Sequence, residues 1–246
     1  MLIDARDTIF QTNPFLQVPR EENLDRDDGV LLFFGVSPAY FDTLSITRYR
    51  TLSLSCLTCT LLSNIQKENI EATRLGLSAK NRKWLTNAYG EVVADIMKEK
   101  PTICSGSTMG EQVALETYLR AMVGESDETG VVLKGADQGF HNYLYYSNKL
   151  GNAKTIRSIV VQDQGSAIVN NIGAMRTKEL GEWGNGKLIE TTEVDGKTTE
   201  IRVLNWDGEL SPLVHQFDRH KVLSNFWYKK KTSEYRKKWR EVQNKK

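Results

Sequence analysis

The sequence predicts an α/β protein, and three observations support that fold class. Short apolar runs at 2–3 and 29–34, the second bounded by glycines, are typical of buried strands. Apolar residues recur at helical spacing over 91–98, so we expect an amphipathic helix there that follows a break at Gly90 and ends before Pro101. A composition of 39% hydrophobic and 26% charged residues is ordinary for a globular domain.

Charge is distributed unevenly along the 246 residues. The formal net charge is +2, but residues 228–246 carry +7 and the remainder of the chain carries −5. A weakly acidic body disfavours nucleic acid as a partner. The sequence has no run of 18 apolar residues, so we expect no transmembrane segment in this chain. We therefore expect a catalytic or binding domain over 1–225 and a basic tail over 226–246.

The first fifteen residues place two carboxylates directly after an apolar run. Asp4 and Asp7 follow residues 2–3, and an Asn-Pro turn at 13–14 comes soon after them. This pattern predicts a buried parallel strand whose carboxyl end carries the acids, where ligands of open α/β sheets bind. A bend at 5–6 would bring the two carboxylates together as an oxygen site suited to Mg²⁺ or Mn²⁺. The alternative is a solvated turn with a surface ion pair.

Residues 36–66 have an unusual composition. Within this segment, 51–63 contains only Thr, Leu, Ser and Cys. Leu52 and Leu54 alternate with Ser, which is one argument for a strand. The hypothesis we favour is an intron-encoded insertion, because codons for these four residues are rich in pyrimidines, as is the 3′ end of an intron. Two cysteines in the run, at 56 and 59, have redox or zinc spacing, but no second pair completes such a site.

The stretch 102–110 combines a short apolar run with small residues. It predicts a strand that turns into a helix, because Thr108 and Glu111 have the spacing of a capping box. Small residues such as Ser105 and Gly106 at a helix N-terminus let the backbone approach a ligand and donate hydrogen bonds to it. Many strand-to-helix turns share this pattern, so it is a weak signal on its own.

A further helix is predicted to open within 135–142. Asp137 lies where an N-cap belongs, and such a cap contributes about 1 kcal/mol of stability. Gln138 and Asn142 are four residues apart, so they share one face of that helix.

The last third of the chain predicts more strands and a terminal helix. We expect a strand, a turn and a strand over 156–175, and a hairpin turn at 194–197. His215 follows an apolar pair, a pattern that is usually a hydrogen-bonded structural histidine. Tyr235 and Trp239 are spaced i, i+4 within the basic tail, which favours an amphipathic helix with either a solvated face or an attraction to anionic membranes.

Four segments resemble, in the same order, a group of nucleotide-sugar glycosyltransferases of the GT-A fold. They are 4–15, which resembles the metal-site segment of that group, then 80–110, 136–145 and 203–220. Together they cover about half of the chain. The resemblance implies a GT-A-like (Rossmann-like) mixed sheet with flanking helices. It also implies that the first nucleotide-binding βα units of the group are missing here, so we expect an N-terminally shortened member.

The resemblance also implies roles for individual residues. The cation, Mn²⁺ or Mg²⁺, would be bound by Asp4, Asp7 and His215. The nucleoside-diphosphate sugar would be bound by Asp4, Arg6, Ser105, Gly106 and Gln138. Asp137 would be the general base or an anchor for the sugar. The resemblance does not identify the acceptor of the sugar, which is a glycan, a protein or a lipid.

Two alternatives to an active enzyme follow from the same observations. The first alternative is a catalytically inactive fragment, because the first nucleotide-binding units are missing, and the second is a non-enzymatic sugar-binding module. The resemblance implies the Golgi lumen if an N-terminal anchor precedes the chain, and the cytoplasm otherwise.

Overall fold

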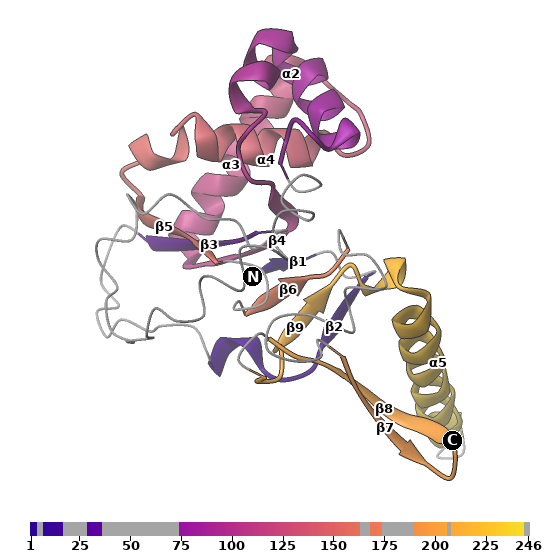
Figure 1. Cartoon of the computed structure of the whole chain (residues 1–246). Coiled ribbons are helices and arrows are strands. Elements are labelled where there is room, and N and C mark those ends of the chain that lie inside the picture. Colours follow the sequence, from indigo (N-terminus) through magenta and orange to yellow (C-terminus); the bar gives the residue numbers. More distant parts are fainter. Residues whose placement is uncertain are drawn as a thin grey trace, which may run out of the picture.

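The computed structural model describes residues 1–3, 7–16, 29–35, 74–162, 168–173, 189–205 and 208–243. Over these ranges the protein is a mixed α/β protein with four α-helices and three small sheets, which confirms the predicted class at this level (Figure 1). Residues 36–66, which we expect to be an intron-encoded insertion and which contain Cys56 and Cys59, lie outside the described residues. Within the described ranges, no helix is both long enough and apolar enough to cross a membrane.

The largest sheet has four strands in the order β1-β4-β3-β5. Their bounds are β1 Leu2–Ile3, β3 Gly29–Gly35, β4 Ile103–Gly110 and β5 Ile156–Gln162. Strand β3, which the sequence predicts, runs parallel to β5 and antiparallel to β4. The prediction of a buried parallel strand at 2–3 is wrong, because β1 lies at the edge, is only half-buried and runs antiparallel to β4.

Three helices lie on one side of this sheet (Figure 1). They are α2 Ala79–Met97, α3 Gln112–Thr129 and α4 Ala136–Tyr146. Helices α3 and α4 lie against the strands of the sheet, and α2 packs on α4 further out. Phe33 of β3 is fully buried beneath α3 and α4, with its ring centroid 5.5 Å from that of Tyr118 and 4.4 Å from that of His141. Gly90 interrupts α2 with a φ of 83°, so the predicted break is confirmed.

The opposite face of the sheet packs on a second, three-stranded sheet of order β2-β9-β6. Its strands are β2 Thr8–Phe10, β6 Val169–Asn171 and β9 Leu213–His215. Leu32 and Met109 of the first sheet contact Val169 and Leu213 of the second in one buried cluster. The two strands predicted over 156–175 therefore belong to different sheets, since β5 pairs with β3 and β6 pairs with β9.

A hairpin and a long helix complete the described structure. Strands β7 Ile189–Val194 and β8 Lys197–Val203 form the hairpin, and Asp195 and Gly196 adopt φ angles of 51° and 67° at its tip. These left-handed angles are those of a two-residue hairpin turn, so the turn predicted at 194–197 is confirmed. Helix α5 Lys221–Gln243 begins before the boundary expected for a basic tail at 226, and its first turns bury Leu223 and Trp227 in the core.

Both predicted helix caps are wrong. Thr108 lies inside β4, where it pairs with Leu2 on one side and Phe33 on the other, so strand pairing prevails over the capping-box signal. Helix α3 begins after Glu111, whose side chain makes no capping bond. The N-cap of α4 is Gly135, with a φ of 88°, and Asp137 lies in the first turn of the helix instead.

The pH dependence of stability tests the burial of His141. Its Nδ1 atom lies 2.8 Å from the Tyr118 hydroxyl, and burial lowers the pKa of the imidazole to about 3. An unfolded chain takes up this proton near pH 6.5, so the native state loses stability as the pH falls from 6.5 towards 3.

We expect this histidine to contribute about 2 kcal/mol of destabilisation between pH 7 and pH 5. Urea unfolding of the wild type and of His141→Gln at the two pH values measures the difference. Equal losses of stability in both proteins would contradict the assigned burial.

Candidate functional site

The candidate site is centred on a contact between Asp7 and His215, from the two ends of the sequence. Asp7 directly precedes β2, and His215 ends β9, with Thr8 paired opposite His215 in the antiparallel register. Asp7 Oδ1 lies 3.5 Å from His215 Nδ1, and the two side chains are 5% and 2% exposed. Thr8 Oγ1 lies 3.0 Å from the same nitrogen, across 207 positions of sequence.

The apolar core around β9 fixes this contact. Leu213 and Val214 are fully buried, and Phe217, which follows a left-handed turn at Gln216 with a φ of 63°, packs in the same core cluster as Val214. The backbone N–H of Gln216 donates to the carbonyl oxygen of Asp7 at 2.8 Å. The imidazole is thus held by the strand pairing and by the turn that follows it.

Gly106 brings the first sheet against this histidine. A Cβ atom at Gly106 would lie only 2.6 Å from His215 Nε2, so the close approach of β4 to the imidazole requires glycine. Cys104, two residues earlier on β4, is also buried, and burial raises the pKa of its thiol to about 11. A thiol with this pKa is protonated at neutral pH, so we do not assign Cys104 as a nucleophile.

Ser105 faces the other way, towards helix α4. Its hydroxyl donates to Asp137 Oδ2 at 2.8 Å, and its backbone N–H donates to Gln138 Oε1 at 2.9 Å. Asn142, one turn further along α4, accepts from the N–H of Ile103 and donates to its carbonyl oxygen, both at 2.9 Å. Gln138 and Asn142 therefore share one helix face, as predicted, and that face docks α4 on β4.

The structure groups the candidate residues into two clusters on opposite faces of β4. Asp7 and His215 lie on the Gly106 side, and Asp137 and Gln138 lie on the Ser105 side. The expected Ser-Gly turn is instead the middle of a strand. Within the described structure, β1 pairs with β4 at Ser107 and Thr108.

An apolar groove of roughly 550 Å³ opens beside Asp137. Its walls come from α3, from the loop before α4 and from α4 itself, and they include Met122, Val123, Val132 and Phe140. Val123 and Val132 are 60% and 92% exposed, so the groove presents apolar surface to solvent.

Asp7 and His215 fit a divalent cation in part. Two ligand atoms at adjacent octahedral positions, each about 2.1 Å from a cation, lie roughly 3 Å apart. The observed 3.5 Å between Asp7 Oδ1 and His215 Nδ1 is close to that value. In the part of the chain that the structure describes, no group of three His, Cys, Asp or Glu side chains surrounds one cation. Asp4 and Arg6, the other predicted residues of this segment, lie outside the described residues.

The sequence prediction missed two contributors. Thr8 contacts the imidazole of His215. The sequence indicated this contact only by placing a hydroxyl side chain next to Asp7. Asn142 was placed on the correct helix face, but nothing local indicated that it binds the backbone of β4.

A methyl group at residue 106 tests the contact between the sheets. In Gly106→Ala the new atom meets a buried ring, so we expect a loss of about 1–3 kcal/mol in the free energy of unfolding. Gly124→Ala is the matched control, because Gly124 lies inside α3 with no atom within 4 Å of an added Cβ, and alanine there should be neutral or stabilising. Urea unfolding measures both, and equal stabilities would contradict the contact.

Comparisons of this chain with models of protein families, with curated proteins and with solved structures give no match.

Proposed function

We propose that this protein is a metal-dependent glycosyltransferase of the GT-A type that uses a nucleoside-diphosphate sugar. The observation that supports this proposal best is the buried contact between Asp7 and His215. These residues come from the first and last of the four segments that resemble such enzymes. Two segments that far apart in sequence meet here through one strand pair.

In this proposal, Asp7 and His215 bind Mn²⁺, or Mg²⁺, together with Asp4 and oxygen atoms of the donor diphosphate. The cation supplies Lewis-acid stabilisation of the leaving diphosphate. A neutral imidazole beside a carboxylate suits Mn²⁺ better than Mg²⁺, because Mg²⁺ prefers an all-oxygen ligand set. Thr8 Oγ1 contacts the same Nδ1 atom, so a cation bound there would replace this hydrogen bond.

Asp137, Ser105 and Gln138 hold the sugar in this proposal. Asp137 is exposed and accepts a hydrogen bond from the hydroxyl of Ser105. A sugar hydroxyl can donate the same kind of hydrogen bond to this carboxylate. Gln138 follows Asp137 in the sequence, and its side-chain oxygen accepts a hydrogen bond from the backbone N–H of Ser105 in β4. In this proposal the sugar would contact these residues while its diphosphate binds the cation held by Asp7.

The acceptor would enter next to Asp137, where the apolar groove opens. From this position the Asp137 carboxylate serves as the general base that accepts a proton from the attacking hydroxyl.

The second candidate function, a sugar-binding module without turnover, requires the same Ser105 and Asp137 contacts but no cation. Turnover and cation dependence therefore distinguish the two.

Thermal unfolding tests the cation site. Mn²⁺ with uridine or guanosine diphosphate, each tried separately, should stabilise the wild type, because a ligand present at 100 times its Kd adds about 2.7 kcal/mol. For a chain of this size the expected rise in Tm is on the order of 5–10 °C. Asp7→Asn should show no rise, and Asp137→Asn should retain it. Equal shifts in the wild type and Asp7→Asn would overturn the assignment of Asp7.

Asp137→Asn tests the sugar end of the site. Asparagine retains the size and the contact with Ser105, so we expect a change in stability of at most about 1 kcal/mol, from the lost charge at the α4 N-terminus. Turnover, measured as release of nucleoside diphosphate, should fall by about 10²-fold or more. Asp127→Asn on α3, also exposed, is the control. Retained turnover in Asp137→Asn would remove this residue from catalysis, and absent turnover in the wild type would favour a binding module.

A further inference from the structure

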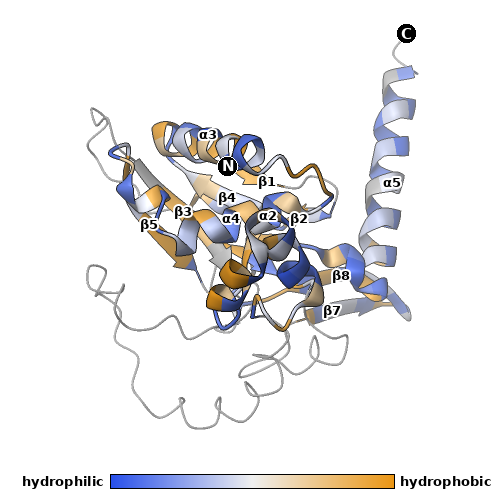
Figure 2. Cartoon of the chain, turned by 90° about the horizontal axis from the view of Figure 1, so that it is seen from above, coloured by the Kyte–Doolittle hydropathy of each residue, from blue (hydrophilic) through white to orange (hydrophobic). Residues whose placement is uncertain are grey.

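Helix α5 is anchored at one end and projects into solvent at the other. Leu223 and Trp227 are buried in the core cluster, whereas the described side chains from Tyr228 onward are exposed. Figure 2 shows the C-terminal half of the helix extending away from the rest of the described structure. Packing against the body therefore does not explain the residues of this half.

The projecting half carries an aromatic stripe. Tyr228, Tyr235 and Trp239 are spaced i, i+7 and i+11, so they fall on one side of an α-helix with 3.6 residues per turn. They are 40%, 71% and 56% exposed. Tyr228 also packs against Phe217 with ring centroids 5.5 Å apart, so the stripe begins at the core and continues outward.

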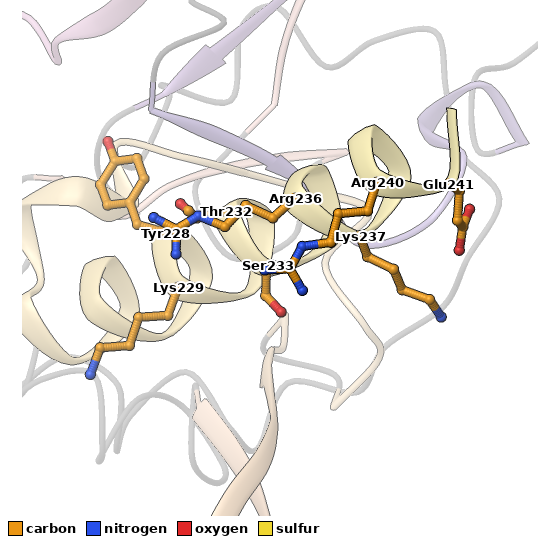
Figure 3. A pocket seen from close by; sticks show the side chains of 8 residues that line it. All are labelled: Tyr228, Lys229, Thr232, Ser233, Arg236, Lys237, Arg240 and Glu241. Carbon is orange, nitrogen blue, oxygen red and sulfur yellow. The ribbon is translucent and has the colours of Figure 1, made fainter. Parts of the chain in front are cut away.

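Cations flank this stripe. Helical spacing places Lys229, Arg236 and Arg240 along one side of it and Lys238 on the other, while Glu234 lies towards the opposite face. Figure 3 shows Lys229, Arg236 and Arg240 along a groove of roughly 660 Å³ whose described walls all belong to α5. Among the described residues, none of these three side chains pairs with an acid. Glu241 lines the same groove as Arg236 and Arg240, at its far end.

We propose that α5 docks the protein on an anionic membrane surface, with the helix lying in the plane of the interface. Tyr and Trp side chains combine an apolar ring with a polar group, which suits the level of the lipid headgroups. Lysines and arginines beside them reach the phosphate and carboxylate groups of anionic lipids. This surface is independent of the proposed transferase site, and it requires neither a cation nor a donor.

The charge of the rest of the chain gives the docking an orientation. Residues before 228 carry a net charge of −5, so an anionic bilayer repels the body while it attracts the helix. A second copy of this helix is a poorer partner, because its cations would meet like charges. A nucleic-acid duplex is also a poorer partner, because its phosphates would bind the cations but it offers no apolar layer for the exposed rings of Tyr235 and Trp239.

The test is co-sedimentation of the full chain with phosphatidylcholine vesicles that contain about 30% phosphatidylserine, and with phosphatidylcholine vesicles alone. We expect binding to the anionic vesicles only, and release at about 1 M salt, where the Debye length is near 3 Å. Arg236→Glu with Arg240→Glu should weaken binding by at least about 100-fold. Tyr235→Ala with Trp239→Ala should weaken it by about 10-fold or more without changing the salt dependence.

Lys80→Glu with Lys83→Glu is the matched control, because it makes the same change of charge at exposed positions of α2. Circular dichroism checks that every variant is folded. Three results would overturn the proposal: equal binding to both vesicles, an equal loss in the α2 control, and tighter binding to a DNA duplex than to anionic vesicles. Self-association through the aromatic stripe, seen as a dimer that Trp239→Ala dissociates in solution, would also overturn it.

Discussion

The antiparallel pairing of β2 with β9 is the constraint on which the candidate site depends. Its register places Thr8 opposite His215, and the neighbouring Asp7 then lies at the end of the same pair. A shift of one residue would turn every side chain of β2 to the other face of the sheet. Ile9, which packs against the core beside Val214, would then point away from it. Burial of apolar residues on one face therefore fixes the position of the polar pair at its end.

The second constraint is the closeness of the two sheets at Gly106. Apolar side chains fill the space between the sheets where Met109 and Leu213 meet, but at Gly106 the histidine ring takes up that space. The absence of a side chain at one position of β4 thus allows a buried imidazole to contact a neighbouring strand. On the opposite face of the same strand, amide side chains from α4 bind the backbone. Strand β4 consequently connects the two clusters of candidate residues, although they do not touch each other.

Features with a local physical cause could be predicted from the sequence. The apolar run of β3, the break at Gly90 and the turn at 194–197 each follow from a few neighbouring residues, and the structure confirms them. Predictions that ignored neighbouring strands were wrong. Thr108 has the spacing of a cap, but two adjacent strands satisfy its backbone, and β1 joins the sheet antiparallel at an edge. The contact of Asp7 with His215 depends on long-range register, which spacing along the chain does not encode.

The strand pair at the site also determines when the site can form during synthesis. Thr8 emerges from the ribosome 207 positions ahead of its partner His215. At about 5–20 residues per second, the N-terminal segment waits roughly 10–40 s before β9 exists. During that interval β2 is an unpaired strand with exposed backbone groups, which other chains can bind. Helices α2, α3 and α4 and strand β4 lie within residues 79–146, so their contacts with one another are closer in sequence and can form first, and the candidate site is completed last.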